Sequence, residues 1–377
     1  MKLMHLSDLH LGKTLSNYSL IEDQKYILNR IVEIAEAQKP DCILIAGDVF
    51  DRVAPSAEAV SMFDDFLSRL ATYNIPILII AGNHDSPERI AYGGRIMQNS
   101  GIYLSPVYDG TVNSITLSDE HGDVCFWLLP FLRPADVRLH FTDKKIVSAT
   151  DALWTVIASM NIDPSMRNVL IAHQFVTGAT LSESEEIYQG TAEQVSADLF
   201  DPFEYTALGH LHRAQNVRSA RIRYCGTPLK YSVAEADNVK SVTFSEIGKK
   251  GTDPIITTIP LMPLRDMQKL QGSFQELMSG SRNENFVHIM LTDATDVPDA
   301  MGKLSIRYPY ILGLDYEKQH TYDRSSMQEL IQNSEKDPES LFSAFFEHVF
   351  ATKMTDKQAK IIQDLVTEIW AKEEDDE

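Results

Sequence analysis

Cysteine is scarce in this chain of 377 residues, and the three cysteines present do not suit disulfide bonds. Cys42, Cys125 and Cys225 are odd in number, widely spaced and set in apolar or strand-like surroundings. Small secreted domains that depend on disulfides carry many more cysteines, usually in even numbers. We therefore expect three buried, reduced thiols, and we exclude a disulfide-rich secreted scaffold.

Long apolar runs are also missing. The sequence contains no stretch of about 18 apolar residues, which is the length needed to cross a membrane. Met1 leads directly into a strand-like segment rather than into a signal peptide. Internal repeats are absent, and the one biased segment is the acidic tail Glu373–Glu377. These absences exclude membrane-spanning and repeat architectures, and they predict a cytoplasmic protein without a membrane partner.

Positive charge is in short supply, because 34 basic side chains are set against 54 acidic ones, which gives a net charge of −20. A protein whose own surface binds DNA is ordinarily basic. The charge is uneven, however, since residues 213–230 carry five cations and no acid. We interpret this segment either as a patch that follows phosphates or as an ordinary solvated hairpin. The five cations are Arg213, Arg218, Arg221, Arg223 and Lys230.

What the sequence does contain is a set of short apolar runs, each followed at once by residues that bind metals. The run Cys42–Ala46 is typical of a strand buried between helices, and Gly47 and Asp48 follow it. Open α/β sheets bind ligands at the carboxyl ends of their strands, so we expect one shared site. The other examples are Asp8 and His10 after 2–6, Asn83 and His84 after 75–81, His173 after 168–172, and His210 and His212 after 205–208.

Each of these residues alone has an ordinary explanation. A single Asp after a strand more often caps the next turn, and a single His is more often a satisfied core residue than a ligand. Together, two Asp, one Asn and four His can hold two ions if Asp48 is shared, and paired ions in hydrolases lie about 3.5 to 4 Å apart. Carboxylate, amide and imidazole ligands suit manganese, iron or zinc better than magnesium.

The motifs Asp-x-His, Gly-Asp, Gly-Asn-His-Asp, a lone His and Gly-His-x-His resemble those of the calcineurin-like metallophosphoesterases. Their fuller wording is similar to that of SbcD-type nuclease subunits over essentially the whole chain, more weakly after about residue 263. The segments that carry this resemblance are 7–12, 47–52, 82–86, 209–212 and Gly226-Thr-Pro-Leu-Lys-Tyr-Ser232.

The resemblance implies an α/β fold, a two-sheet sandwich flanked by helices, and a phosphodiester hydrolase. The enzyme would be a manganese-dependent exonuclease on double-strand ends and an endonuclease on hairpin or single-stranded DNA, in DNA repair, recombination and replication. Its partner would be an SMC-like ABC ATPase of the SbcC type. Because the chain is acidic, we infer that it binds DNA weakly alone and that the partner supplies much of the affinity.

The resemblance also implies a role for each site residue. His84 would hold no metal and would either give a proton to the leaving oxygen or stabilise the charge on the phosphorane. Asp51, three residues after Asp48, would orient His84, or it would only cap the following turn. Two ions, most simply manganese, would be held by Asp8, His10, Asp48 and His212 on one side and by Asp48, Asn83, His173 and His210 on the other.

Two points stay open at this stage. A homodimer within a heterotetramer is implied through helices near 55–73 and 87–99, although their apolar residues could equally pack on the sheet. The signature also allows a small-molecule phosphodiesterase or a phosphoprotein phosphatase of the same fold. From a different class, the alternative is a scaffold that binds without catalysis.

Hydrophobic periodicity divides the chain into three expected parts. Residues 1–263 alternate strands with helical stripes, among them one from Val60 to Leu70 with Pro55 in its first turn. Residues 264–322 predict a small α/β module with a helix over 297–307 that has Pro298 in its first turn, similar to the capping domain of such nucleases. Residues 323–377 are expected to hold a helical pair.

This C-terminal pair is expected to bind the coiled-coil base of the ATPase, although it could instead dock on its own chain. Asp337 and Pro338 fit the start of the first helix. Thr355 with Gln358 gives a capping-box signal for the second. The apolar contacts proposed for the partner are Phe342, Phe345, Phe346 and Phe350 on the first helix, and Ile362, Leu365 and Trp370 on the second.

Overall fold

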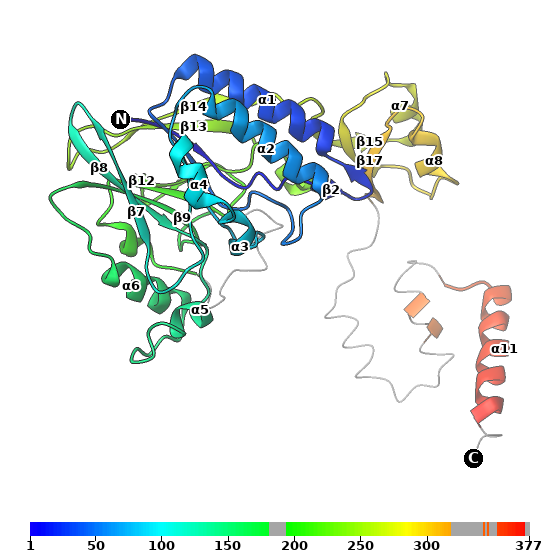
Figure 1. Ribbon diagram of the computed structural model, residues 1–377. Coiled ribbons are helices and arrows are strands. Elements are labelled where there is room, and N and C mark those ends of the chain that lie inside the picture. Colours follow the sequence, from blue (N-terminus) through cyan, green and yellow to red (C-terminus); the bar gives the residue numbers. More distant parts are fainter. Residues whose placement is uncertain (181–193, 318–341, 344, 347–352, 374–377) are drawn as a thin grey trace. The chain divides into compact units, whose positions relative to one another are not determined.

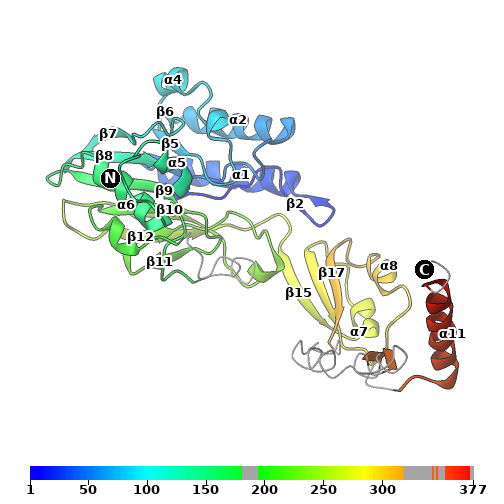
Figure 2. The same ribbon diagram turned by 90° about the horizontal axis from the view of Figure 1, so that it is seen from below.

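The computed structural model describes residues 1–180, 194–317, 342–343, 345–346 and 353–373. It forms two compact units, each described by itself here. Figures 1 and 2 give two views at right angles. The first unit contains Met1–Leu270, Gly280–Ile289 and Met301–Gly313, and the second contains Gln271–Ser279, Met290–Ala300 and Leu314–Glu377. The domain boundaries that the sequence indicates, at residues 263 and 322, stay predictions.

The first unit is built on two six-stranded sheets. In the first sheet the order is β14-β13-β1-β4-β5-β6, and β1, β4, β5 and β6 run parallel. Strands β13 and β14 pair with each other as an antiparallel hairpin. The strands are β1 (Lys2–Leu6), β4 (Cys42–Ala46), β5 (Ile77–Ile80), β6 (Ile102–Leu104), β13 (Ser241–Glu246) and β14 (Ile255–Pro260).

The second sheet has the order β11-β12-β10-β9-β8-β7. Its four inner strands are parallel, and both edge strands are antiparallel to their neighbours. The two sheets and their helices confirm the predicted α/β sandwich. The strands are β7 (Asn113–Asp119), β8 (Gly122–Leu129), β9 (Arg167–His173), β10 (Tyr205–Gly209), β11 (Gln215–Val217) and β12 (Ser219–Tyr224).

Three apolar layers hold the sandwich together. Successive side chains of a strand point to opposite faces, so Leu44 packs between the sheets while Ile43 and Ile45 pack under helices. Helices α1 (Ile21–Gln38) and α2 (Ala57–Ala71) cover the first sheet. Helices α5 (Pro134–Arg138) and α6 (Ala149–Ser159) cover the second sheet on the opposite side (Figure 1). Burial on both faces explains why these strands read as continuous apolar runs.

Helix α2 shows how local chemistry sets a helix start. The Oγ of Ser56 accepts a hydrogen bond from the N–H of Ala59 at 3.2 Å, so Ser56 is the N-cap. Pro55 therefore lies before the helix, and its predicted place in the first turn is wrong. Val60 is 46% exposed and does not belong to the buried stripe. The buried face consists instead of Ala59, Met62, Phe66, Leu67 and Leu70.

A third, smaller sheet follows, with strand order β15-β16-β17. The alternation of strands and helices predicted for this part is confirmed, but helix α8 starts at Ala300, two residues after Pro298, and is shorter than predicted. Its elements are β15 (Met267–Gly272), α7 (Phe274–Ser279), β16 (Phe286–Leu291), α8 (Ala300–Leu304) and β17 (Tyr310–Tyr316). Short elements elsewhere are β2 (Thr14–Leu15), β3 (Tyr18–Ser19), α3 (Pro87–Ile90) and α4 (Gly94–Met97).

The second of the two predicted C-terminal helices is confirmed as α11 (Asp356–Glu373). Its capping box is formed by Thr355 and Gln358, with the Thr355 N–H donating to the Gln358 side chain at 2.9 Å. Of the first predicted helix, Phe342, Phe345 and Phe346 are described and are helical. The remaining predictions for it, Asp337, Pro338 and Phe350, fall outside the described residues, as does the Trp370 side chain.

Two expected absences can be checked against this fold. The three cysteines are buried and free, which confirms the sequence-based expectation. Among the helices that the structure describes, none has the length and apolar character needed to span a bilayer.

Replacing Leu44 by alanine tests the space between the two sheets. Leu44 is 0% exposed, so Leu44→Ala should lower the free energy of unfolding by about 2 to 5 kcal/mol through lost burial and a residual cavity. The control Val60→Ala removes an exposed side chain and should change it by less than about 0.5 kcal/mol. Urea unfolding followed by tryptophan fluorescence measures both. Equal losses would contradict the position assigned to Leu44.

Candidate metal centre

The carboxyl ends of β1, β4, β5, β9 and β10 meet at one place where the two sheets touch. Parallel pairing puts the ends of β1, β4 and β5 side by side, and likewise those of β9 and β10. His173 joins the two sheets, because its Nδ1 lies 2.8 Å from the main-chain oxygen of Ala46. The N–H of His210 does the same by donating to Asp8 at 3.0 Å. The structure thus gathers the seven predicted ligands into one cluster of donors, in which Asp8, His10, Asp48 and His173 are buried and the other three are half-buried.

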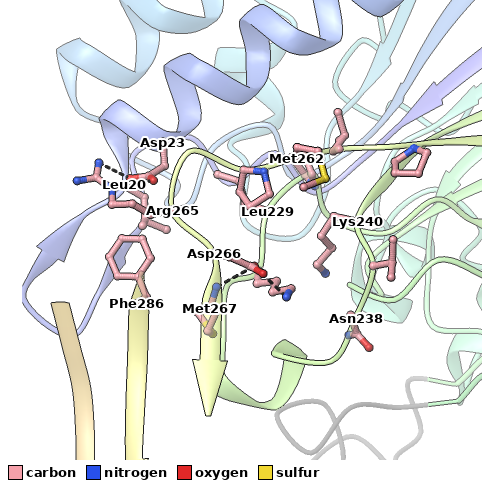
Figure 3. Close-up of a pocket in the computed structure, with 16 residues that line it drawn as sticks. Leu20, Asp23, Leu229, Asn238, Lys240, Met262, Arg265, Asp266, Met267 and Phe286 are labelled. Atoms are coloured by element: carbon pink, nitrogen blue, oxygen red, sulfur yellow. Dashed lines mark hydrogen bonds and ion pairs between the residues drawn. The ribbon is translucent and has the colours of Figure 1, made fainter. Parts of the chain in front are cut away.

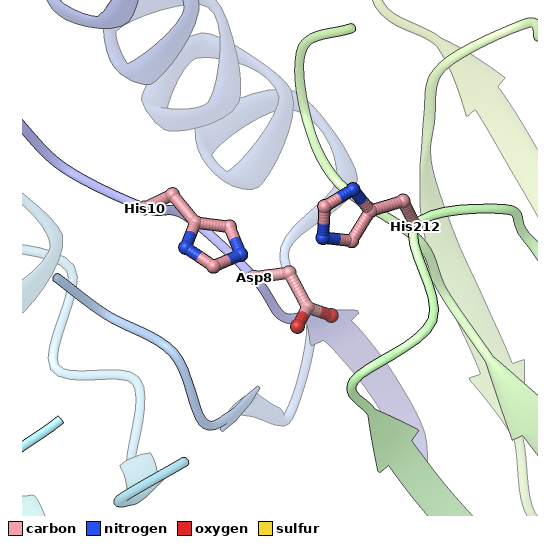
Figure 4. Close-up of side chains that lie close together, drawn as sticks. All are labelled: Asp8, His10 and His212. Atoms are coloured by element: carbon pink, nitrogen blue, oxygen red, sulfur yellow. The ribbon is translucent and has the colours of Figure 1, made fainter. Parts of the chain in front are cut away.

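One group of donors consists of Asp8, His10 and His212, whose candidate ligand atoms all lie within 4.8 Å of one another (Figure 4). His10 Nε2 is also 3.8 Å from an oxygen of Asp48. These are the four residues that the family resemblance assigns to the first ion. They come from three different strands.

A second group consists of Asp8, Asp48 and His173, again within 4.8 Å. The Oδ1 of Asn83 lies 2.9 Å from His173 Nε2 and 3.0 Å from His210 Nδ1, so the amide oxygen stands between the two rings. Asp48 contacts donors of both groups, with one oxygen 3.4 Å from His173. This position suits a carboxylate shared by two ions.

The main chain at the ligands is held in unusual conformations. Asp8, His10 and Asp48 have φ values of 52°, 44° and 50°, a region that costs residues other than glycine about 1 kcal/mol or more each. Close packing demands glycine beside them, since a Cβ on Gly82 would lie 2.1 Å from Asp48 Oδ1. The glycine of the Gly-Asn motif is therefore required because no side chain fits beside Asp48. The positive φ values direct the ligand side chains toward one another.

The chemistry of the donors fits divalent ions. His10 is 2% exposed, yet neither of its ring nitrogens has a hydrogen-bond partner among the residues that the structure describes. Burial raises the pKa of Asp8 to about 6. Burial also opposes charge on Asp48, but His173 holds the pKa of Asp48 below its usual range, and Asp48 in turn raises the pKa of His173 to about 9 against burial. Imidazole nitrogens without hydrogen bonds and buried carboxylates are both stabilised when a cation binds between them.

His84 is exposed beside the cluster, and with His10 and Asp48 it forms a third group whose candidate ligand atoms lie within 4.8 Å of one another. Its main-chain N–H donates to Asp48 at 2.8 Å, and its ring centroid is 4.9 Å from that of His10. Its ring nitrogen Nδ1 lies 3.0 Å from the main-chain oxygen of Asp51. Asp51 therefore contacts His84, as the prediction requires, but it does so through its main-chain oxygen, and its carboxylate is turned toward Lys13 at 2.8 Å. The bond to a carbonyl puts the proton on Nδ1 and leaves Nε2 available.

Asp85 supports the cluster and was missed by the sequence analysis. Its carboxylate accepts hydrogen bonds from the main-chain N–H groups of Val49, Phe50 and Gly82, at 2.9 to 3.1 Å. It thereby ties the segment after β4 to the segment after β5. Its place directly after His84, in Gly-Asn-His-Asp, was the available signal.

Glu235 and Lys240 were also missed. Glu235 Oε1 lies 3.0 Å from His212 Nδ1, and Glu235 Oε2 lies 2.5 Å from the Lys240 ammonium. Burial works to raise the pKa of Glu235, but His212 and Lys240 outweigh it and lower the pKa to about 2. No motif marks either residue, because they lie 23 and 28 residues after His212 and meet it only in the fold.

Comparison with known proteins places this arrangement. A family model described as calcineurin-like phosphoesterase matches residues 1–214, and one described as type 5 capsule protein repressor C-terminal domain matches residues 263–350. The D subunit of the SbcCD nuclease of Staphylococcus saprophyticus is 33% identical over 376 residues, which covers 97% of this chain and 98% of that protein. The chain belongs to the SbcD family of calcineurin-like phosphoesterases. As an SbcD-type protein it is a metal-dependent nuclease, a hydrolase of phosphodiester bonds.

Two solved structures are also similar. TT1561 of Thermus thermophilus is 12% identical and covers 69% of this chain and 99% of its own, with a TM-score of 0.41. A dimetal phosphatase from Danio rerio is 10% identical and covers 68% of this chain and 98% of its own, also with a TM-score of 0.41. The assignment to the SbcD family rests on the sequence matches.

The five cations predicted to contact DNA do not form a free patch. Arg213, next to His212, is exposed, but the fold brings acids and polar groups from elsewhere to the other four. Arg218 pairs with Asp198 and Asp201, Arg221 with Asp253 at 2.6 Å, and Lys230 with Asp266 at 2.9 Å, while buried Arg223 bonds to Asn216 at 2.7 Å. The sequence count missed these partners because the acids lie outside residues 213–230.

Removal of metal tests the shared position of Asp48. A chelator should abolish phosphodiester cleavage by the native protein, and added divalent ions should restore it. Asp48→Asn should lose metal and activity together, because both groups of donors use this carboxylate. The exposed Asp65→Asn on α2 is the control and should keep both. Metal content is measured by mass spectrometry after dialysis, and a full complement in Asp48→Asn would contradict the assignment.

Proposed function

We propose that this protein cleaves DNA ends and hairpins with two manganese ions, as the nuclease component of a complex with an SMC-like ABC ATPase of the SbcC type. The observation that supports it best is the complete set of seven donors at the ends of five strands, with His84 exposed beside them. The similarity to the D subunit of an SbcCD nuclease extends over 97% of the chain, so it covers more than the metal site. Because the proposed substrate is DNA, we place the nuclease activity in the cytoplasm.

The mixture of donors supports manganese, although the same mixture would also suit iron or zinc. Asp8, Asp48 and Asn83 offer oxygens, and the four histidines offer imidazole nitrogens, a mixture that suits manganese better than magnesium or calcium. Asp8, His10, Asp48 and His212 would hold one ion, and Asp48, Asn83, His173 and His210 the other. Held by these residues, two divalent ions would supply Lewis-acid chemistry that polarises the phosphate and lowers the pKa of the attacking water.

His84 supplies the proton. The carbonyl of Asp51 accepts from Nδ1 and fixes the ring, so Nε2 is the atom that meets the substrate. The ring is exposed on the side from which a phosphodiester would enter. Protonated at Nε2, His84 gives this proton to the leaving oxygen of the DNA chain, which then departs as a neutral hydroxyl group.

The cations after His212 divide into two kinds. Arg223 and Lys230 are held inside the fold and serve structure first. Arg218 and Arg221 pair with exposed acids, and surface ion pairs are worth only about 0 to 1 kcal/mol. A DNA phosphate can therefore replace these acids. We assign the main phosphate contact to Arg213, with Arg218 and Arg221 joining it when DNA is bound.

The C-terminal segment is the proposed contact with the ATPase. On α11, Ile361 and Leu365 are 53% and 48% exposed, and Phe342 and Phe345 before it are each 40% exposed. Exposed apolar residues at helical spacing are typical of helices that bind in a partner's groove. Aromatic anchors often dominate such binding. We therefore propose that this segment binds the coiled-coil base of the ATPase.

A homodimer within a heterotetramer completes the proposal. Tyr92 and Ile96, beside and within α4, are 84% and 76% exposed. Two large apolar side chains so close together on the surface favour a protein contact. They lie in the region 87–99 that the family resemblance implies for the dimer.

The role of His84 is tested by separating cleavage from metal binding. His84→Ala should lower the rate of cleavage by about 10² to 10⁴, the usual worth of a general acid, while both ions stay bound. His121→Ala, in the turn between β7 and β8, is the matched control and should retain activity. Rates on a DNA hairpin and metal content are measured on the same preparations. An ion lost from His84→Ala would mean that His84 is a ligand.

The contact with the ATPase is tested on α11. The double variant Ile361→Asp, Leu365→Asp should keep metal-dependent cleavage of a small phosphodiester but should no longer co-purify with the ATPase. Lys360→Asp changes charge on the same helix without removing an apolar side chain, so it should still form the complex. Unchanged binding by the double variant would show that the helix has another task.

A further inference from the structure

His212 is held from behind by a buried carboxylate. Its Nδ1 lies 3.0 Å from Oε1 of Glu235, which is 0% exposed. An ionised carboxylate can only accept, so Nδ1 carries the proton and Nε2 presents its lone pair. Figure 4 shows the ring directed toward the space that it shares with Asp8 and His10. The carboxylate therefore selects the tautomer that a metal ligand needs.

Lys240 holds the same histidine at a second point. Its ammonium group donates to Glu235 Oε2 at 2.5 Å, to Thr227 Oγ1 at 2.6 Å and to the main-chain oxygen of His212 at 2.8 Å. Lys240 therefore fixes the main chain of His212 directly and its ring through Glu235. A histidine held at both points can neither rotate its ring nor shift its main chain.

The buried ion pair of Lys240 and Glu235 is an energetically unfavourable way to fill the protein interior. Each buried charge loses several kcal/mol of solvation, and well-packed apolar residues in place of such a pair are often neutral or stabilising. Both side chains are almost fully buried, at 6% exposed for Lys240 and 0% for Glu235. Stability alone therefore gives a poor reason for the pair, whereas its two contacts with His212 give a specific one.

We propose that Lys240 and Glu235 are positioning residues of the nuclease: they hold His212 so that Nε2 faces the ion shared with Asp8, His10 and Asp48. The proposal rests on the proposed role of His212 as a metal ligand. Neither residue touches the substrate. Outer partners of this kind are worth about 10 to 100-fold in metal affinity.

The experiment compares Lys240→Met with Lys250→Met in the full-length protein. Lys250 is a matched control, because it pairs at 2.7 Å with the buried carboxylate of Glu204, which lies at the opposite end of β10 from His210. Manganese affinity is measured by titration calorimetry. The kcat and KM for bis(p-nitrophenyl) phosphate are measured across manganese concentrations. Melting temperatures report folding.

Lys240→Met should weaken one of the two ions by about 10 to 100-fold. Its kcat should recover at high manganese concentration while KM stays unchanged, a pattern that general loss of structure would not give. Lys250→Met should keep both affinities. Lys240→Arg keeps the charge, and Lys240 borders a cavity of about 170 Å³ (Figure 3), so its affinity should lie closer to the native value. If Lys240→Met does not fold, Glu235→Gln takes its place with the same expectation.

Three results would overturn the proposal: native affinity for both ions in Lys240→Met, an equal loss in Lys250→Met, or weaker binding by Lys240→Arg than by Lys240→Met. His212→Ala separates this failure from failure of the proposed function. Two ions bound normally by His212→Ala would show that His212 is not a ligand. A weakened ion in His212→Ala beside unchanged Lys240→Met would overturn the positioning role alone.

Discussion

The structure depends on the contact between Asp48 and His173 where the two sheets meet. Asp48 follows a strand of one sheet and His173 ends a strand of the other, and their side chains lie 3.4 Å apart in the protein interior. A buried carboxylate is tolerated only when opposite charge or hydrogen-bond donors compensate the solvation that it loses. The contact between Asp48 and His173 thus holds the two sheets together at one end. The same buried carboxylate favours cations at that place, so the packing of the sheets and the metal centre depend on the same charged group.

Strain at the ligands is compensated by the apolar layers. Asp8, His10, Asp48 and His210 all have positive φ, and such conformations persist where the surroundings fix them. The surroundings here are strands buried on both faces, under α1 and α2 on one side and α5 and α6 on the other. The packing of these rigid strands therefore offsets the conformational energy of directing several side chains toward one point. His84, in contrast, lies on an exposed loop, as suits a group that meets a large substrate.

The surplus of acid also has a structural consequence. Arg218 and Arg221 are paired with Asp198, Asp201 and Asp253. If DNA contacts these arginines as proposed, it has to displace these acids, and the displacement would weaken the net attraction of each phosphate. This is consistent with a nuclease that relies on a partner to hold DNA.

The sequence by itself determined the alternation of strands and helices and the set of seven donors, whereas the two-sheet sandwich was implied by the family resemblance. The alternation and the donors follow from local signals: apolar runs of strand length mark the strands, and parallel strands bring the residues at their carboxyl ends together. The helix start at Ser56 was missed by a residue or two, because a cap depends on side-chain geometry that periodicity does not contain. Only the tertiary structure decided which atoms meet across long separations. The carbonyl of Asp51, rather than its carboxylate, faces His84. Glu235 and Lys240 pack behind His212, and acids from distant segments pair with the arginines. Such contacts arise from the packing of segments that are far apart in sequence, and no spacing along the chain encodes them.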